Sequence, residues 1–436
     1  MENKIHKFGE KVLYLYLFFL FVVMPLYSKG GYHMISTKKW ALFCNVSYGY
    51  QFGYFFIPGF LIILSFCFIF EVLFYKAYVE KFDKADIMLL LFGVVVALSE
   101  KISFYHLTYF VTEESQAFVG YRGWYMGLIA QISFILIYFF VKRYWGGSKR
   151  IVDIAIIGST IVFFLAVLNR FDIDLLGFTG SLLEVDKHDY VSTIGNINWY
   201  VCYLAVLFPL SVYSYIGASN RIKKILYGIA IMIGTATLVT QGSDSAFLVL
   251  GVLVLYLLKN EDNNVLIELL LIVSGTCILI GFLQNLFSSY AYVPNRLSEL
   301  VTKSFVLYVL FGLGLLFRNK IDLFDKFKKL VFKMIPILLL LVIVYILLNT
   351  FNILPEQLRT YGYFRISDSW GNNRGNIWRV GVYAFIAFVI DHPYVLFLGA
   401  GPDQYANMIF TYNYEEVVVQ RSTVFVSCAH NEFLNT

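Results

Sequence analysis

The chain has 436 residues, of which 59% are hydrophobic and 14% are charged, and its mean hydropathy is +0.70. This composition excludes a soluble globular protein and is typical of a helical protein that crosses a membrane several times. The formal net charge of +5 calls for no nucleic-acid partner, because the cytoplasmic loops of membrane proteins are basic in any case.

A membrane-spanning helix usually needs about 17–25 mostly apolar residues. By this criterion, about eleven apolar runs of the sequence are predicted to be spans. They lie at roughly 11–27, 54–75, 86–104, 124–141, 151–169, 198–217, 225–241, 244–258, 265–287, 300–317 and 331–350. The basic start of the chain resembles a signal peptide, but no small-residue cleavage site follows the first run. We therefore expect the first run to be a retained span.

The charges of the loops predict an orientation. Lysine and arginine gather in alternate loops, at 76–84, 142–150, 221–224, 259 and 318–329, whereas the loops between them are poorer in these residues. The one discordant pair is Lys38 and Lys39. The positive-inside rule then places the N-terminus in the cytoplasm and the tail, residues 351–436, outside the cytoplasmic membrane.

The tail is the one long segment that is neither apolar enough to span a bilayer nor short enough to be a turn. Its apolar run at 378–390 is too short to cross and ends at His392 and Pro393, so we expect a helix in the loop or at the interface. The sequence thus divides into N-terminal spans (1–190), a transmembrane core (191–350) and a large extracytoplasmic loop (351–436), where we expect the reactive chemistry.

Two short polar segments lie at span ends on the expected outer side. The segment 192–199 reads S-T-I-G-N-I-N-W, and its Asn196 and Asn198 either bind a ligand or simply cap a helix. The segment 240–245 reads T-Q-G-S-D-S, which is ordinary turn composition. However, its Asp244 lies at or just inside the interface, where an acidic group is costly and often functional.

The tail adds a cation and a base. Arg374 lies among amides and near Trp378; it is either a solvated surface charge or a phosphate ligand, since guanidinium offers phosphate a rigid fork of donors. His430 is suited to taking a proton near neutral pH, although a loop histidine is often structural or idle.

Metal and soluble-enzyme chemistry are disfavoured. The five cysteines, Cys44, Cys67, Cys202, Cys277 and Cys428, form no CxxC or Cys/His cluster, which leaves a disulfide between Cys44 and Cys428 as one possibility. Asp172 and Asp174 have the spacing of a metal-binding DxD, but such triplets arise often by chance. P-loop, GxSxG and HExxH motifs are absent from the sequence, and we predict no metal and no cofactor.

Taken in this order, the segments resemble the O-antigen ligase/polymerase superfamily of bacterial envelope proteins. T-I-G-N-I-N-W at 193–199 resembles the family's GNxN helix start, and T-Q-G-S-D-S-A at 240–246 resembles its T-x-S-R turn. Arg374, Trp378, D-H-P at 391–393, G-A-G-P at 399–402 and A-H-N-E-F-L at 429–434 resemble its outer loop. The resemblance covers residues 190–436; the earlier spans match only in hydropathy.

The resemblance implies a membrane glycosyltransferase that moves a glycan from undecaprenyl diphosphate to an acceptor hydroxyl, in O-antigen, capsule or other surface polysaccharide assembly. Arg374 would bind the diphosphate and offset the charge of the leaving group, and His430 would orient or deprotonate the acceptor. Asn431, Asn196 and Asn198 are weaker candidates for hydrogen bonds to substrate. A flippase and a chain-length regulator are possible partners.

Two departures from the family pattern stand out. The turn carries Asp244 where relatives often have an arginine, so that either another cation, such as Arg365 or Arg379, supplies the second phosphate ligand or the geometry of the diphosphate differs. The chain also stops at Thr436, where relatives continue into at least one further span, which is what a truncated product would show.

Three alternatives stay open at this point. The residues do not separate a polymerase, whose acceptor is another lipid-linked unit, from a ligase, whose acceptor is a lipid, a protein or a wall polymer. A polysaccharide flippase is the rival from another class, although alternating access expects a site near the midplane and often repeats, and a non-catalytic sensor is a third.

Overall fold

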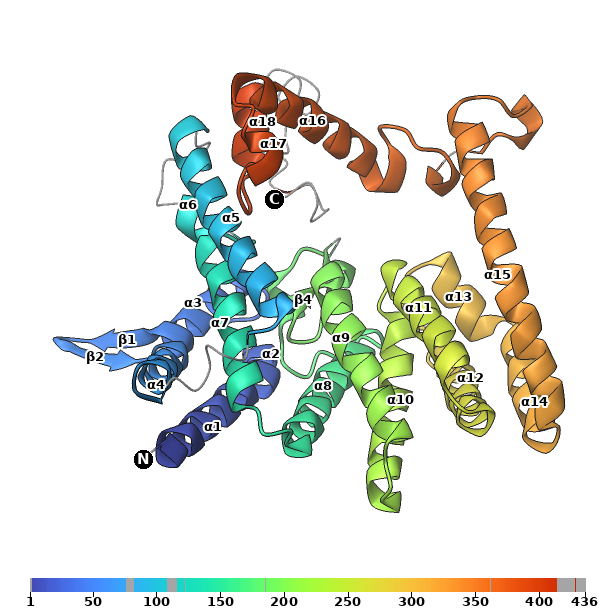
Figure 1. Cartoon of the computed structure of the whole chain (residues 1–436). Helices are drawn as coiled ribbons and strands as arrows, with labels where there is room; N and C mark the ends of the chain where they lie inside the picture. The colour runs from blue at the N-terminus through green and yellow to red at the C-terminus, as the bar shows by residue number, and fades with distance from the viewer. Residues whose placement is uncertain are drawn as a thin grey trace. The chain divides into compact units, whose positions relative to one another are not determined.

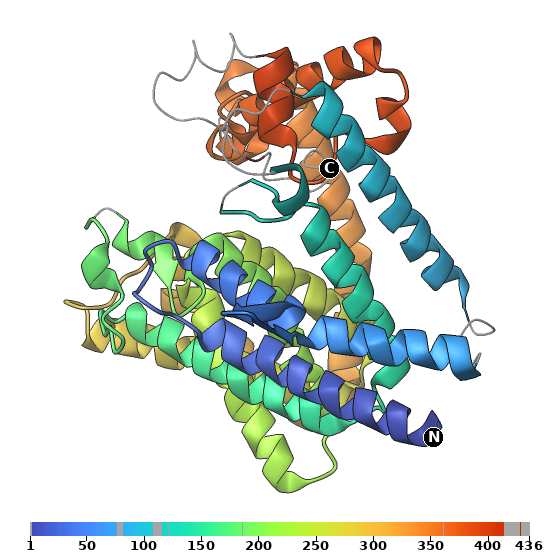
Figure 2. The same cartoon turned by 90° about the vertical axis from the view of Figure 1, so that its left-hand side faces the viewer.

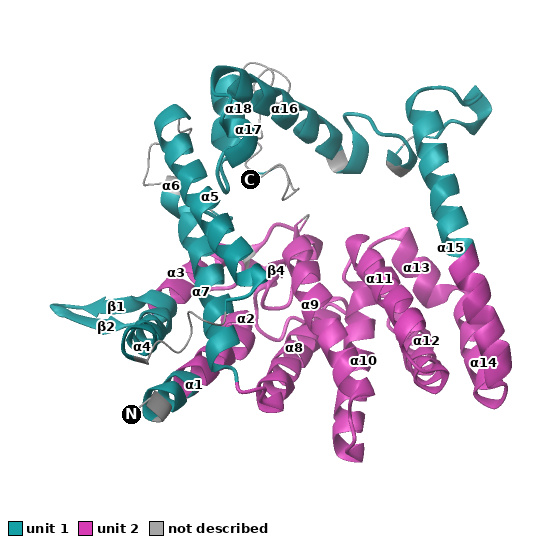
Figure 3. Ribbon diagram, viewed as in Figure 1, with its two compact units in different colours: residues 1–10, 46–145, 334–436 teal, residues 11–45, 146–333 magenta. Residues whose placement is uncertain are grey.

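The computed structural model describes residues 2–75, 82–107, 116–121, 123–184, 186–360, 362–413 and 428. The chain divides into two compact units, coloured separately in Figure 3. Unit 1 contains Met1–Glu10, Val46–Trp145 and Met334–Thr436, and unit 2 contains Lys11–Asn45 and Gly146–Lys333.

The described part of the chain is mainly helical. Its helices are α1 (Glu2–Phe18), η1 (Phe19–Val23), α2 (Met24–Leu26), α3 (Ile35–Tyr48), α4 (Phe60–Tyr75), α5 (Lys84–His106), α6 (Gln116–Val119), α7 (Leu128–Tyr144), α8 (Lys149–Asn169), η3 (Thr179–Ser181), η4 (Lys187–Asp189), α9 (Ile197–Ile216), α10 (Arg221–Thr240), α11 (Ser245–Asn260), α12 (Asn263–Leu286), α13 (Arg296–Lys303), α14 (Val306–Asn319), α15 (Ile321–Thr350), η5 (Glu356–Leu358), η6 (Gly362–Phe364), α16 (Trp370–Asp391), α17 (Val395–Leu398) and α18 (Tyr405–Tyr412). Two antiparallel hairpins pair β1 (Gly49–Phe52) with β2 (Phe55–Pro58) and β3 (Tyr190–Val191) with β4 (Gly195–Asn196).

Several helices are long and apolar enough to cross a membrane, which marks the chain as a multi-pass membrane protein. Seven segments qualify: Lys4–Leu26, Lys84–His106, Lys149–Asn169, Ile197–Ile216, Arg221–Thr240, Asn263–Leu286 and Ile321–Thr350. Helices α13 and α14, which meet at 47°, make an eighth if they count as one bent span. The predicted number of about eleven is therefore not confirmed; α4 and α11 are apolar but shorter.

The prediction of a span over 54–75 is wrong at its start. Residues 49–58 form the β1–β2 hairpin, with Phe52 paired to Phe55 across a two-residue turn. Gly53, the first residue of that turn, has φ +58°, a conformation that hairpin turns require and glycine adopts without strain. Helix α4 begins only at Phe60, after Pro58.

Unit 2 is a helical bundle with one continuous apolar core. Helix α10 packs against α8, α9 and α12, and η1 and α2 lie beside α8 (Figures 1 and 2). Leu204, Ile231 and Val239 are fully buried there. Close approach of α9 and α10 depends on Gly234, because a Cβ at this position would lie 2.5 Å from a ring carbon of Phe208.

The two ends of the unit 2 bundle differ in chemistry. At one end, Lys223 pairs with Asp153 at 2.7 Å and Lys224 with Glu268 at 2.8 Å. The other end holds the loops that follow α8, α10 and α12 together with the start of α9 (Figure 1). Both predicted polar segments, 192–199 and 240–245, lie at this second end, which we call the polar end of unit 2.

In unit 1, the tail has a core of its own. Helices α16 and α18 pack together around Ala384, Phe388 and Tyr405, and the end of α5 joins them through Leu107. The Tyr405 hydroxyl donates to the Ile377 carbonyl at 2.6 Å. The helix expected at 378–390 exists but is longer, so that Arg374 and Arg379 lie on a helix rather than in a loop.

The disulfide considered between Cys44 and Cys428 is not formed. All five cysteines are free thiols, and Cys67, Cys277 and Cys428 are buried. Buried cysteines of this kind pack as small apolar side chains.

Candidate functional site

Asn196 caps helix α9. Its side-chain oxygen accepts a hydrogen bond from the backbone N–H of Asn198 at 2.9 Å, which satisfies a donor that every helix leaves unpaired in its first turn. Gly195, just before it, has φ +102°, so the strand-to-helix bend needs glycine. The capping interpretation of Asn196 is confirmed, and a ligand role is not needed to explain this residue.

Ser192 lies in the turn of the β3–β4 hairpin and ties it to α8 and to the segment that contains Tyr32. Its N–H donates to the Asn169 side chain at 2.8 Å, its hydroxyl donates to the Val162 carbonyl at 2.6 Å, and its carbonyl accepts from the Tyr32 hydroxyl at 2.8 Å. Ser192 holds a left-handed conformation, φ +56°, which costs a non-glycine residue energy and persists only where neighbours enforce it. The start of α9 is thus rigidly placed.

The α10–α11 turn folds back on itself through Gln241. The Gln241 side chain donates to the Ser243 carbonyl at 2.7 Å and accepts from the Ser243 N–H at 2.6 Å. The Ser243 hydroxyl is 2.6 Å from that of Ser245 and 3.5 Å from the Asn198 side-chain oxygen. The two polar segments, separated along the chain by the whole of α9 and α10, therefore meet at the polar end of unit 2.

Asp244 is held by a residue that the sequence did not single out. The Asn295 amide donates to the Asp244 carboxylate at 2.9 Å and to the Gly242 carbonyl at 3.2 Å. Asn295 also caps α13, because its side-chain oxygen accepts from the Ser298 N–H at 2.8 Å. The loop before α13 is thereby tied to the α10–α11 turn.

Arg170 supplies the positive charge of this end, and sequence reasoning missed it. Its side chain donates to the His188 carbonyl at 2.9 Å and to the Gln241 carbonyl, and it lies over the Tyr292 ring at 5.3 Å. The residue is 2% exposed. Burial lowers the pKa of Arg170 to about 10, so it remains protonated at neutral pH.

The charge of Arg170 has no carboxylate partner within 4 Å among the described residues, and its Nε is buried without a hydrogen bond. A buried cation that lacks a counterion raises the local positive potential. One signal could have identified it: an arginine directly after the run 151–169, on the side that the positive-inside rule leaves poor in cations.

Arg374 lies in the first turns of α16, in unit 1. The side chain is half-buried, and the described part of the chain offers it no hydrogen bond or ion pair. The rings of Trp370 and Trp378 lie 5.3 Å apart, one on each side of it in sequence. Gly371 and Asn373 have φ +58° and +66°, so this helix start is irregular.

The two other predicted arginines are engaged locally. Arg379 donates to the Asp368 carboxylate at 3.1 Å and to the Asn376 side chain at 2.8 Å, and Arg365 donates to the Asn352 side chain at 3.1 Å. That one of them binds a phosphate stays a prediction. His430 and Asn431 lie outside the described residues.

A further polar cluster in unit 1 joins α5 to the G-A-G-P turn of the tail. Ser99 and Ser103 donate to the carbonyls of Gly399 and Ala400. Glu100, between them, is 2% exposed, and neither of its carboxyl oxygens has a hydrogen-bond partner among the residues that the structure describes. Asp403 accepts from the N–H of Tyr121 at 2.6 Å. An ionisable group inside a membrane-spanning helix is a candidate functional residue.

Comparison with protein-family models, curated proteins and solved structures finds no match to this chain.

Proposed function

We propose that the chain is a membrane glycosyltransferase of the O-antigen ligase/polymerase type, acting on a glycan linked to undecaprenyl diphosphate at the extracytoplasmic face of the cytoplasmic membrane. The observation that carries the proposal is the meeting of the G-N-I-N and T-Q-G-S-D-S segments. Asn198 and Ser243 come within 3.5 Å beside the buried Arg170, so two motifs that resemble the family share one site.

Arg170 lies behind the turn that carries Asp244. Its guanidinium contacts the carbonyl of Gln241, and a Cβ at Gly242 would lie 3.6 Å from it. We infer that Arg170 places positive charge behind the turn whose sequence carries an aspartate. In this role Arg170 positions the turn and sets its potential; it is too buried to bind a diphosphate directly.

The proposed reaction is a single displacement. The acceptor hydroxyl oxygen forms a bond to the anomeric carbon, the bond from that carbon to the diphosphate oxygen breaks, and its electron pair leaves with undecaprenyl diphosphate. His430 takes the proton of the hydroxyl. Arg374 lies on α16, and the described residues offer its guanidinium no hydrogen bond or ion pair. It offsets the charge that develops on the leaving oxygen.

Three carboxylates in or near the predicted spans have fixed partners within the protein and do not require a transported ion. Glu71 pairs with Arg143 at 2.6 Å, and Asp153 and Glu268 pair with Lys223 and Lys224. A carboxylate that is neutralised by a fixed partner needs no transported ion to stabilise it. These three residues therefore do not favour the flippase.

The test uses purified protein and an undecaprenyl-diphosphate oligosaccharide, with release of undecaprenyl diphosphate and glycan length as readouts. Arg374→Ala and His430→Ala should each lower turnover by roughly 100-fold or more, as expected for lost charge stabilisation or acid–base catalysis. Arg150→Ala removes an exposed arginine at the other end of unit 2 and should leave turnover unchanged. Normal turnover in both the Arg374 and the His430 variants would contradict the proposed site. With the unmutated protein, a ladder of glycan products would indicate a polymerase.

Transport is the second candidate, and it is favoured by the buried carboxyl of Glu100, which has no hydrogen-bond partner within the described part of the chain. Glu100→Gln keeps the shape and removes the titratable group. If the unmutated protein shows no turnover but moves lipid-linked oligosaccharide across vesicles, and Glu100→Gln abolishes this movement, the chain is a transporter. Turnover that survives Glu100→Gln would assign Glu100 a structural role.

A further inference from the structure

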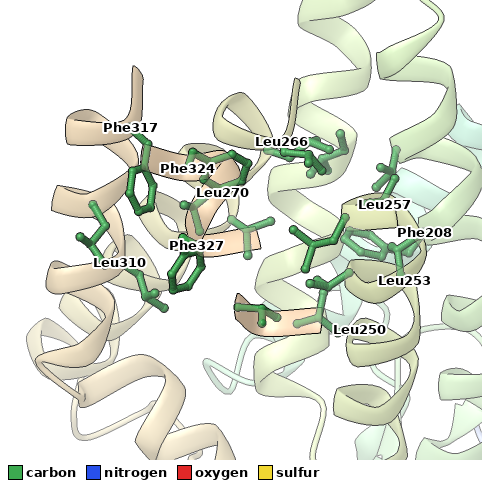
Figure 4. Close-up of a pocket in the computed structure, with 18 residues that line it drawn as sticks. Phe208, Leu250, Leu253, Leu257, Leu266, Leu270, Leu310, Phe317, Phe324 and Phe327 are labelled. Carbon is green, nitrogen blue, oxygen red and sulfur yellow. The ribbon is translucent and has the colours of Figure 1, made fainter. Parts of the chain in front are cut away.

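Unit 2 contains an apolar cavity of about 330 Å³ between α9, α10, α11, α12, α14 and the start of α15. All 18 residues that line it are apolar (Figure 4). Figure 4 shows Phe317 and Phe327 on one side and Phe208 and Leu253 on the other, with Leu266 and Leu270 between them. A site with this lining offers no hydrogen bond to water and fits a hydrocarbon ligand.

The cavity extends from the core of unit 2 to its surface. Ile231 and Phe208, at its inner wall, are 0% and 1% exposed, whereas Val254 and Phe327 are 42% and 40% exposed. In a membrane protein, an apolar surface of this kind contacts lipid. A hydrocarbon chain can therefore enter between α11 and α15 and reach the interior.

The cavity occupies the end of unit 2 opposite to Arg170. Most of its lining comes from the C-terminal parts of α11 and α14 and the N-terminal parts of α12 and α15, and the rest comes from α9 and α10. The adjoining ends of these helices and the connections between them carry six basic side chains, Lys259, Arg318, Lys320, Lys326, Lys328 and Lys329, against four acidic ones, Glu261, Asp262, Asp322 and Asp325. The excess positive charge lies beside the apolar cavity.

Two of these six basic side chains, Lys328 and Lys329, are used within the fold. Lys328 donates to the Glu261 carbonyl at 3.3 Å, and Lys329 pairs with Asp325 at 2.7 Å. Arg318, Lys320 and Lys326 are exposed and form no ion pair within the part of the chain that the structure describes. They are available to an external anion.

We propose that this cavity binds one acyl chain of an anionic phospholipid, whose headgroup phosphate lies on Arg318, Lys320 and Lys326. Burial of the acyl chain and attraction of the phosphate to the basic cluster both contribute to binding, as in other sites that combine an apolar and an electrostatic contact with lipid. The lipid fills the space between the α11–α12 and α14–α15 pairs. The lipid site is separate from the proposed site for the glycan donor, because it lies at the other end of the same helices. The proposal of a lipid site does not depend on whether the chain is a glycosyltransferase.

The test is photocrosslinking in nanodiscs of phosphatidylcholine and phosphatidylglycerol. The probe is phosphatidylglycerol with a diazirine in its acyl chain, and adducts are mapped by peptide mass spectrometry. Adducts should concentrate in 250–258, 266–273 and 310–331. Residues 337–344 of α15, which are exposed throughout, provide the reference for bulk lipid. Equal labelling of the cavity peptides and this reference would overturn the proposal.

Competition and variants test the two halves of the site. Unlabelled phosphatidylglycerol should displace the probe, and phosphatidylcholine should not; equal displacement by both would overturn the assignment of an anionic lipid. Removing two cations in Lys320→Gln/Lys326→Gln should lower the preference for phosphatidylglycerol by roughly tenfold.

Leu269→Trp fills the cavity and should abolish the cavity adducts. Leu279→Trp adds the same bulk at an exposed position of the same helix and should leave them unchanged. If Leu269→Trp prevents folding, the competition measurement on the unmutated protein decides. Cavity adducts that persist in a folded Leu269→Trp protein would overturn the proposal.

Discussion

The ammonium of Lys39 caps the carbonyl end of the first apolar segment. It donates to the carbonyls of Met24 and Pro25 at 2.9 and 2.8 Å. Cations are favourable at the C-terminal end of a helix, where the last carbonyls lack intrahelical partners; here the Met24 carbonyl also accepts from the Tyr27 N–H at 3.3 Å. Burial nevertheless lowers the pKa of Lys39 from 10.5 to about 7, so this lysine carries only part of a charge at neutral pH.

Lys39 therefore makes stability depend on pH. Below about pH 7 the folded protein bears the full cost of a buried charge, and the cost disappears as pH rises from 7 toward 10.5, since the unfolded chain binds the proton more tightly over this range. We expect the melting temperature of the detergent-solubilised protein to rise between pH 7 and 10, and Lys39→Met to flatten this rise. Lys38→Met is the control; an equal rise in all three proteins would contradict the prediction.

Gly401 allows the tail to approach α5 closely. It has φ +94°, and a Cβ would lie 2.7 Å from the Ser103 hydroxyl. Gly401→Ala should lower the free energy of unfolding by about 1–3 kcal/mol. The alanine would be strained at a positive φ, and its methyl group would clash with the Ser103 hydroxyl. Gly251→Ala, in helix α11 with nothing within 4 Å of the new methyl, should be neutral or slightly stabilising. The two variants can be compared by thermal unfolding, and equal stability would argue against the close contact.

At the scale of elements, the connection from α15 to α16 is organised by one buried amide. Asn349 is 0% exposed, and its amide donates to the carbonyls of Thr360 and Phe364 at 2.7 and 2.8 Å. Arg359 closes the same loop by donating to the Leu354 carbonyl at 2.7 Å. The loop is held by polar contacts with few apolar ones.

Asn349→Ala should release this loop. Loss of the two hydrogen bonds should lower the free energy of local opening by about 1–3 kcal/mol. The loop then opens more often, and tryptic cleavage after Arg359 and Arg365 should become several-fold faster. Asn260→Ala removes an exposed, local bond to the Tyr256 carbonyl and serves as the control. Unchanged cleavage rates would show that other contacts hold the loop.

Helix α16 shows where element prediction from sequence fails. Its apolar part, 378–390, was predicted, whereas its first turns contain glycine and asparagine at 371–376, which have low helix propensity. They are nevertheless held in place, because the Asn376 N–H donates to the Asp368 carbonyl at 2.9 Å. A Cβ at Gly375 would lie 1.9 Å from the Ser367 carbonyl, so close contacts with the segment just before the helix outweigh its low propensity.

At the scale of the whole molecule, the orientation in the membrane remains a prediction of the loop charges. In a variant whose five cysteines are replaced by serine, Ser369→Cys in the tail should react with a membrane-impermeant maleimide on intact cells. Lys320→Cys, between α14 and α15, should react only after permeabilisation. The positive-inside rule gives this direction, and the opposite pattern of labelling would invert the topology and remove the site from the outer face.

The sequence by itself determined the class of protein and most helix positions, because runs of apolar residues longer than a span can hardly be stable except in lipid or in a core. It also indicated Asn198 and the 240–245 turn. The tertiary structure decided which polar groups meet: Ser243 beside Asn198, Asn295 on Asp244, and Arg170 behind the turn. Such contacts join residues far apart in the chain, and their geometry depends on how helices pack, which no local pattern of residues specifies.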